Sequence, residues 1–502
     1  MDTLRKITLF AFVLLVAIAA SAQQRIPCVR NIPTDKARTR GMLGYPNQNW
    51  DPNKTYRQAV VLITFADTDF SMEDPVAYYN RVFNESGYSE GLGHGCVADY
   101  YRDQSGGLFN LQFDIYGPIK VSTNAKSSSN INNGDTEMSE ALAALETLTT
   151  TDFSIYDWNG DGKVEQMLFV APGFSGNQKP GYIWPNTAYA FSKVPGQKDV
   201  VYNSITCEMW VDSTLCGIGT ICHEFAHCLG LPDIYPTSGG GFFSIVDEWD
   251  LMDGGNYTGK GWCPPNFSAT ERMLMGWLTP TELTAATSIT GMKPLSEGGE
   301  TYIVRNSGHA DEFYILENRR RSNWDKGIPG EGLAIFYVDY NMELWSNNGV
   351  NSSSRHFCYD LFHADGKDYK TWDPANNGKD PNKYVDTENW MYNKYLSTSV
   401  YPYTDPLTLV VNSSLTDETT PAATLYYENA EGVKFMQKAI TNIRIDDDGT
   451  ISFDFMGGTS SIDAIKVTDD SPAVWYDLQG RRLEGKPTRK GIYINNRKKV
   501  AL

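Results

Sequence analysis

The chain has few histidines, a deficit of basic charge and no paired cysteine motif. It holds 6 histidines in 502 residues, and 43 lysines and arginines against 61 aspartates and glutamates, for a net charge of −18. This balance argues against nucleic acid and anionic membrane surfaces as partners, since both attract basic proteins. Beyond the N-terminus, no apolar run approaches the length needed to cross a bilayer. The remaining composition, 41% hydrophobic, is that of a globular protein large enough for two or three domains.

The N-terminal segment has the features of an export signal. Two basic residues precede an apolar stretch from Ile7 to Ala20, and Ala20-Ser21-Ala22 fits a cleavage site. We therefore expect a signal peptide over 1–22, a secreted or cell-surface protein, and a leader or short pro-segment over 23–57. A membrane anchor is the alternative, but fourteen apolar residues are too few to span a bilayer.

Eight cysteines lack the C-x-x-C spacing of a zinc ribbon. In an exported chain the expected state is disulfide bonds, whose connectivity stays open. Neither Cys222 nor Cys228 sits in a nucleophile motif, which disfavours a cysteine protease.

One segment, HEFAHCLGLPD at 223–233, carries the strongest chemical signal. Positions four apart share a helix face, so His223 and His227 present two imidazoles to one point. Two neutral imidazoles suit Zn²⁺, and Glu224 lies beside them as a base rather than a ligand.

The residues that follow extend this motif. Gly230 can adopt a left-handed conformation and turn the chain, which lets Asp233 return as a third, oxygen ligand. Three protein ligands leave a fourth position open, which is typical of a catalytic zinc site. A chance H-E-x-x-H on an ordinary helix is the alternative, and the added glycine and aspartate argue against it.

A second segment, VDEWDLMDGGNY at 246–257, places Met252 in a glycine-bounded turn. A methionine after an extended zinc motif resembles the Met-turn of metzincins, although a lone methionine is more often plain core. Together the two segments resemble the immune inhibitor A family of secreted metallopeptidases. Metzincins usually carry a third histidine where this chain has Asp233, so Glu248 is the reserve third ligand.

The segment DWNGDGKVE at 157–165 follows the rhythm of an EF-hand calcium loop, but Leu168 replaces the usual bidentate glutamate. We expect a structural Ca²⁺ site completed by another segment, with a plain Asn/Gly turn as the alternative. The resemblance to the metallopeptidases includes a similar loop. The expected ligands are Asp157, Asn159, Asp161, Lys163 (through its carbonyl) and Glu165.

The pattern along the chain predicts an α+β protein. Apolar or alternating runs predict strands at 59–65, 109–115 and 167–171, and helices are expected at 75–84, 97–105, 135–148, 217–229 and 268–278. Asp135 is the expected cap of its helix. Beyond about 280 the chain reads as strands and turns.

The resemblance covers roughly 58–455 and implies a metzincin-like zinc metallopeptidase domain, with a mixed sheet and an active-site helix, over 58–280. A β-rich accessory domain would follow over 281–456. The tail, 462–502, resembles a C-terminal sorting domain of the type IX secretion pathway, with a last hairpin of the preceding domain as the alternative.

The family resemblance implies a secreted endopeptidase that acts on proteins or peptides. Glu224 would take a proton from the attacking water, and Tyr257 is a possible oxyanion donor, although a packing role is the more ordinary one. Cys28 could cap the zinc ion in a latent enzyme, but an ordinary disulfide half is favoured. The competing function is an inactive adhesion protein on the same fold, against which Glu224 argues because it binds no metal.

Overall fold

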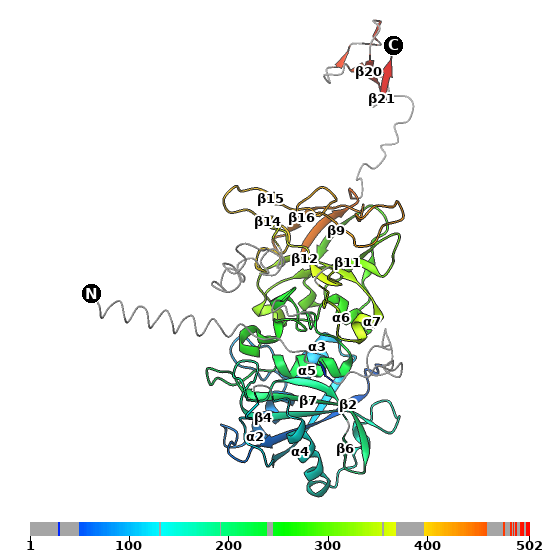
Figure 1. Ribbon diagram of the computed structural model, residues 1–502. Coiled ribbons are helices and arrows are strands. Elements are labelled where there is room, and N and C mark those ends of the chain that lie inside the picture. The colour runs from blue at the N-terminus through cyan, green and yellow to red at the C-terminus, as the bar shows by residue number, and fades with distance from the viewer. Residues whose placement is uncertain are drawn as a thin grey trace, which may run out of the picture. The chain divides into compact units, whose positions relative to one another are not determined.

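The computed structural model in Figure 1 describes most of the chain. Described are 29–30, 50–129, 132–190, 192–237, 244–353, 356–367 and 396–458, and, towards the C-terminus, 475–476, 482–483, 485, 487–488, 492–495 and 498–501. The predicted signal peptide, most of the leader and Cys28 lie outside these residues. The chain divides into two compact units, Met1–Gly458 and Thr459–Leu502. Within the described residues, no helix has the length and apolar character that a membrane span requires.

A mixed sheet forms the centre of the N-terminal half (Figure 1). Its strand order is β1-β5-β7-β4-β2-β3, and β6 pairs with β7. Strands β3, β2, β4 and β7 run parallel to one another, whereas β5 and β6 are antiparallel to β7. The bounds are β1 Val29–Arg30, β2 Thr55–Thr64, β3 Asn110–Lys120, β4 Val164–Phe174, β5 Asn186–Tyr189, β6 Lys193–Val194 and β7 Lys198–Met209.

Strand β2 shows why this sheet is buried on both sides. Successive side chains of a strand point to opposite faces, and seven residues in a row at the end of β2 are buried. Val60 and Leu62 pack in one core cluster, while Val61 and Ile63 pack in another. Residues of the helix α4 (Asp135–Leu148) belong to the second cluster, whereas α2 (Pro75–Asn84), α3 (Val97–Gln104) and α5 (Gly219–Leu229) contribute to the first.

The helix boundaries follow local signals with two corrections. Asp74 caps α2 as its acidic side chain accepts a hydrogen bond from the Ala77 backbone, and Pro75 opens the helix. Asp135 is the first helical residue of α4 rather than its cap, because Gly134 occupies the cap position with φ +75° and offers no side chain. Helix α6 covers only Ala269–Leu274, shorter than expected, and begins with a capping box between Ser268 and Glu271.

A second sheet, in the order β13-β12-β11-β10-β8, follows in the chain. Its bounds are β8 Thr281–Glu282, β10 Tyr302–Arg305, β11 Glu312–Arg319, β12 Gly332–Asp339 and β13 Tyr359–Leu361. Every residue of β11 and β12 is buried. Phe336 and Val338 of β12 pack in the same core cluster as helix α5, while Ile335 and Tyr337 pack in a third cluster. Thus residues on either side of position 280 share one core.

The rest of the larger unit consists of short elements. Strands β9, β17 and β16 form a three-stranded sheet, in which β16 and β17 pair as an antiparallel hairpin. The bounds are β9 Thr287–Met292, β14 Tyr403–Thr404, β15 Val411–Asn412, β16 Ile440–Ile445, β17 Ile451–Phe455 and helix α7 Met342–Ser346. Short 3-10 helices are η2 Phe153–Tyr156, η3 Asp247–Trp249, η4 Gly255–Gly261, η5 Leu295–Glu297 and η6 Asn323–Gly327.

The smaller unit contains one antiparallel sheet in the order β19-β18-β20-β21. Its strands are β18 Trp475–Tyr476, β19 Arg482–Leu483, β20 Ile492–Asn495 and β21 Lys498–Ala501.

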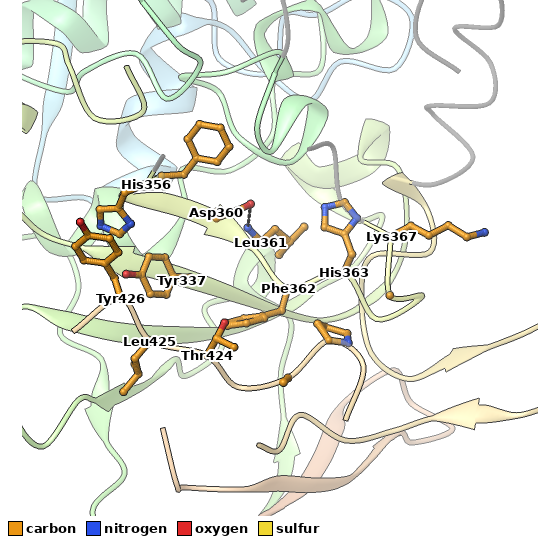
Figure 2. Close-up of a pocket in the computed structure, with 14 residues that line it drawn as sticks. Tyr337, His356, Asp360, Leu361, Phe362, His363, Lys367, Thr424, Leu425 and Tyr426 are labelled. Carbon is orange, nitrogen blue, oxygen red and sulfur yellow. Dashed lines mark hydrogen bonds between the residues drawn. The ribbon is translucent and has the colours of Figure 1, made fainter. Parts of the chain in front are cut away.

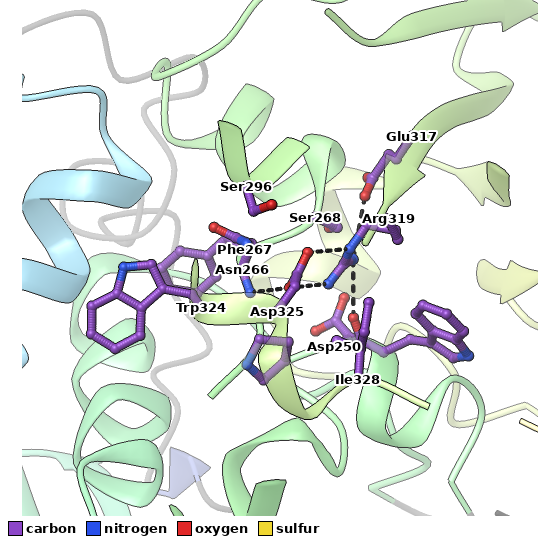
Figure 3. Close-up of polar contacts among 12 residues, drawn as sticks. Asp250, Asn266, Phe267, Ser268, Ser296, Glu317, Arg319, Trp324, Asp325 and Ile328 are labelled. Atoms are coloured by element: carbon purple, nitrogen blue, oxygen red, sulfur yellow. Dashed lines mark hydrogen bonds and ion pairs between the residues drawn. The ribbon is translucent and has the colours of Figure 1, made fainter. Parts of the chain in front are cut away.

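A buried ionic network joins the two sides of the shared core (Figure 3). The guanidinium of Arg319 donates two hydrogen bonds to Asp325, at 2.8 and 2.9 Å, and a third to the Trp249 carbonyl at 3.2 Å. Glu317 lies 3.3 Å from the same guanidinium. A fully buried charge needs such partners, so this network fixes β11 against the segment around Trp249.

The seven cysteines in the described residues are free thiols, so the expected disulfides do not form among them. Six are buried, and three of them, Cys222, Cys228 and Cys358, belong to the same core cluster. Burial raises the pKa of Cys96 to about 12 and of Cys263 to about 11, which keeps both as thiols.

Candidate metal centre

Helix α5 carries the first two candidate ligands inside the protein. All of its residues from Gly219 to Leu229 are buried. The helix ends at Gly230, whose φ of +109° is left-handed and whose N–H donates to the carbonyls of Ala226 and His227, both at 3.0 Å. The predicted glycine turn is therefore present and brings the chain back towards the helix.

Three donor atoms converge beyond this turn. Asp233 Oδ1 lies 3.3 Å from Nε2 of His223 and 3.3 Å from Nε2 of His227. Ligands of a tetrahedral zinc ion, each about 2.0–2.1 Å from the metal, lie about 3.3 Å apart, so these separations fit the ion. Both Nε2 atoms are buried and have no hydrogen-bond partner. Two such orphaned nitrogens beside a carboxylate are the chemistry of a metal site.

The other ring nitrogen of each histidine is held by a backbone carbonyl. His223 Nδ1 lies 2.8 Å from the oxygen of Leu251, and His227 Nδ1 lies 2.7 Å from that of Leu231. A carbonyl can only accept, so each Nδ1 carries a proton and Nε2 is the ring nitrogen left to coordinate a metal. This arrangement orients both imidazoles for coordination through Nε2.

Asp233 is fixed by a residue 115 positions downstream. Asn348 Nδ2 donates to Asp233 Oδ2 at 2.7 Å, and Asn348 Oδ1 accepts from the Asp233 backbone N–H at 2.5 Å. Burial raises the pKa of Asp233, but the two imidazoles outweigh it and hold that pKa well below its ordinary range. The carboxylate is thus ionised, with Oδ1 directed at the histidines. Sequence reasoning missed Asn348, because nothing local to 348 points to position 233.

Glu224 is buried beside the ligands on α5. Its Oε2 lies 2.9 Å from Oγ1 of Thr187, which is also 2.8 Å from the Glu224 carbonyl. Thr187 belongs to β5, the antiparallel strand of the first sheet. A second element therefore positions the carboxylate, and the sequence gave no signal for Thr187.

The predicted Met-turn forms backbone hydrogen bonds with the segment that carries the candidate ligands. Met252 is fully buried, and its carbonyl accepts from the Ile234 N–H at 2.9 Å, one residue after Asp233. Its own N–H donates to Asp250 at 2.8 Å. The structure does not bring Glu248 into the group of converging donors. Tyr257, in η4, accepts from Asn177 at 2.9 Å and packs edge-on against Trp210.

The expected calcium ligands form a self-satisfied loop instead of a converging group. Asp157 accepts from the N–H groups of Gly160, Asp161 and Gly162, and Asn159 accepts from Asp161. Asp161 accepts from Lys163, and Glu165 from Trp158 and Asn159. Burial raises the pKa of Glu165 to about 7. Among the described residues, the side chains of this loop do not form a converging group of metal ligands, so the structure does not support the predicted calcium site.

A second group of potential ligands lies at the end of β12, where sequence spacing indicated none. It consists of Asp339, His356 and Cys358. Here His356 Nε2 and Asp339 Oδ2 already share a hydrogen bond at 2.7 Å, and burial raises the pKa of Cys358 to about 12. His356 stacks on Tyr426 at the edge of a cavity of about 350 Å³, which Figure 2 shows. Unlike the first group, this one is satisfied internally.

Comparison with known proteins yields a family and two relatives. Residues 31–276 match the family model described as the immune inhibitor A peptidase M6 catalytic domain. The chain is 22% identical over 272 residues to the pre-pro-metalloprotease PrtV of Vibrio cholerae serotype O1 (strain M66-2), an alignment covering 47% of this chain and 29% of that protein. It is 24% identical over 259 residues to immune inhibitor A of Bacillus thuringiensis subsp. alesti, covering 42% and 38%. The matches thus span about a third of the relatives' length, and they support the resemblance seen in the sequence.

Proposed function

We propose that the chain is a zinc metallopeptidase of the metzincin-like kind that hydrolyses internal peptide bonds of protein substrates. His223, His227 and Asp233 are the metal ligands, and Glu224 is the general base. The observation that carries the proposal is the convergence of two orphaned, buried imidazole nitrogens and an ionised carboxylate oxygen at 3.3 Å. The similarity to a peptidase M6 catalytic domain and to a protein named as a metalloprotease supports it.

The residues of the chain divide the work of hydrolysis. When bound, Zn²⁺ supplies Lewis-acid chemistry, which lowers the pKa of a water molecule and polarises a peptide carbonyl. Glu224 accepts the proton of the attacking water and passes a proton to the leaving amine. Thr187 holds the Glu224 carboxylate, while the carbonyls of Leu251 and Leu231 hold the imidazoles. For Tyr257 we favour the packing role over oxyanion donation, since its hydroxyl accepts from Asn177 and its ring packs on Trp210.

The competing proposal, an inactive adhesion protein, is less well supported. Adhesion would require neither a buried carboxylate next to the metal ligands nor a strand residue to orient it. Both are present, in Glu224 and Thr187. The family model that residues 31–276 match is also that of a peptidase catalytic domain, which favours a peptidase over an adhesion protein.

The export signals fit the same proposal. A signal peptide over 1–22 and a sorting-like tail over 462–502 would deliver the enzyme through a secretion pathway to proteins outside the cell. This part of the proposal rests on the sequence patterns and is tested by locating the protein in culture medium and cell fractions.

Glu224→Gln tests the mechanism. The substitution keeps the shape of the side chain and leaves the three ligands untouched, so metal content and Tm should stay close to those of the wild type. The rate of peptide hydrolysis should fall by about 10²–10⁴-fold, because general-base catalysis contributes that much. The assay is cleavage of casein and of a peptide library, with and without a chelator. Equal activity in the variant would refute the role of Glu224, and a zinc-loaded wild type that cleaves nothing would favour adhesion.

A further inference from the structure

A cavity of about 400 Å³ lies apart from the candidate metal ligands, between the end of α3, the α6 region and the short helices η5 and η6. Its lining includes Gln104, Asn266, Arg272 and Trp277. Gly106 and Gly298, also in its lining, are exposed, so the cavity opens to solvent. This volume is in the range of small-molecule sites in proteins.

The cavity wall holds a buried positive charge without an acidic contact. Arg272 is 7% exposed. Among the described residues, no carboxylate forms an ion pair with it. Asp325 and Glu317 act on Arg272 from a distance, and their ion pairs are formed with Arg319 (Figure 3). Burial and the neighbouring Asp250 raise the pKa of Glu271, the preceding residue, well above its ordinary value. A buried guanidinium in this setting favours a counter-ion.

Four buried N–H donors of residues that line the cavity also have no hydrogen-bond partner. They are Gln104 Nε2, Asn266 Nδ2, Arg272 Nε and Trp277 Nε1. Gln104 and Asn266 are only 1% and 2% exposed. Their orientation is fixed, because Arg272 Nη2 donates to Gln104 Oε1 and to Asn266 Oδ1, both at 2.7 Å. Gln104 Oε1 also accepts from the Phe267 N–H at 3.0 Å, so turning the amide would break two bonds.

We propose that this cavity binds a carboxylate. Its two oxygens offer about four lone-pair sites, which matches the four orphaned donors, and its charge balances Arg272. Hydrogen bonds to a charged group are stronger than those between neutral groups, so the site should prefer an anion to a neutral ligand. Asp103, also in the lining, does not fill this role, because it accepts from Trp324 Nε1 and Arg102. The carboxylate can come from a small free acid or from the C-terminus of a peptide.

The test measures binding to the purified full chain, with no reference to its activity. Sodium acetate replaces sodium chloride at constant ionic strength, and a second titration uses acetyl-dialanine with a free or an amidated C-terminus. The readouts are Tm and the tryptophan fluorescence of the cavity residues Trp277 and Trp324. We expect saturable stabilisation by acetate, by the free-acid peptide, or by both, and none by the amide. A response to acetate would show that a small free acid is sufficient for binding. A response to the free-acid peptide alone would identify the C-terminus of a peptide as the ligand.

Gln104→Glu is the decisive variant. It keeps the oxygen that accepts from Arg272 and Phe267, removes the Nε2 donor and supplies the missing negative charge from within. We expect a higher Tm than wild type without ligand, and a dissociation constant raised at least about tenfold, as loss of a charge-assisted bond implies. Gln112→Glu, which adds the same charge at an exposed position of β3, is the matched control and should respond like wild type.

Trp277→Phe removes one donor and keeps an aromatic ring, so it should weaken binding less than Gln104→Glu does. It also serves if Gln104→Glu does not fold. The proposal is overturned if neither acetate nor the free-acid peptide stabilises the wild type, or if chloride and phosphate stabilise it equally well. A Gln104→Glu protein that binds like the wild type would overturn it too.

Discussion

The segment 223–233 and the loop 157–165 both have the residue types of metal sites. They differ in whether the candidate ligand atoms already form hydrogen bonds within the protein. In the first, Nε2 of His223 and of His227 lacks any hydrogen bond and points at Asp233. In the second, the side chains of Asp157, Asn159, Asp161 and Glu165 each accept from N–H groups of the loop itself. The difference teaches that ligand spacing alone does not identify a metal site. What identifies it is a set of buried donors that the protein leaves unused.

Removing the third ligand gives the largest expected effect. Asp233→Ala leaves two imidazoles, so we expect loss of zinc from the purified protein and loss of peptide hydrolysis to background. The measurement is metal analysis of protein purified without added metal, followed by the casein assay. Glu248→Ala is the matched control, since Glu248 lies outside the converging group, and it should keep its zinc. Loss of zinc in the control alone would transfer the ligand role to Glu248.

A smaller effect is expected from the residue that orients this ligand. Asn348→Gly removes the amide that holds Asp233 but preserves the positive φ of +54°, which glycine adopts easily. Loss of such an outer partner typically lowers metal affinity by about 10–100-fold. Competition with a chelating dye measures this affinity. Asn348→Asp keeps the acceptor for the Asp233 N–H but not the donor, so its affinity should fall too, and an unchanged affinity in both variants would contradict the assignment.

The two segments should also respond differently to their metals. A ligand that binds only the native state adds RT ln(1 + [L]/Kd), about 2.7 kcal/mol at a hundredfold excess over Kd. We expect zinc restored to stripped protein to raise Tm by this mechanism, and millimolar calcium to leave Tm unchanged. Thermal unfolding in zinc-free and calcium-free buffers is the measurement. A calcium-dependent rise that Asp157→Asn abolishes would restore the calcium interpretation of the loop.

The smallest effect concerns Glu165 at the end of that loop. Burial raises its pKa from an ordinary 4.5 to about 7, so the folded state binds more protons than the unfolded state between these values. Its contribution to stability is therefore complete below pH 4.5 and is lost as the pH rises through 7. In Glu165→Gln, the decline in unfolding free energy between pH 4.5 and 7 should be shallower than in wild type. An identical pH profile, measured by urea titration, would contradict the buried proton.

The sequence predicted the parts of the site that are local in the chain. Helical spacing placed His223 and His227 on one face, and Gly230 predicted the turn that brings Asp233 back to them. Both relations depend only on backbone geometry within eleven residues. Asn348 and Thr187 were missed because they arrive through tertiary packing from other elements. The same limit hid the group at Asp339, which the pairing of β12 with β13 creates.

For the fold, runs of apolar residues predicted most strands and helices, with errors at their ends. The expected disulfides were wrong for the seven described cysteines, since the expectation came from the presumed compartment and not from geometry. The proposed division near residue 280 stays a prediction. Sequence composition changes there, but side-chain packing across it depends on both faces of β11 and β12, which no single segment reveals.

The bond between Asp233 and Asn348 has a consequence for the order in which the protein matures. A ribosome that has made the zinc-binding helix must add more than a hundred residues before it reaches position 348. Until then Asp233 lacks the amide that aims its carboxylate, and a nascent chain holds metal weakly. In the enzyme that we propose, the capacity to cleave peptides would thus arrive late in synthesis, after strands β8 to β12 have been made.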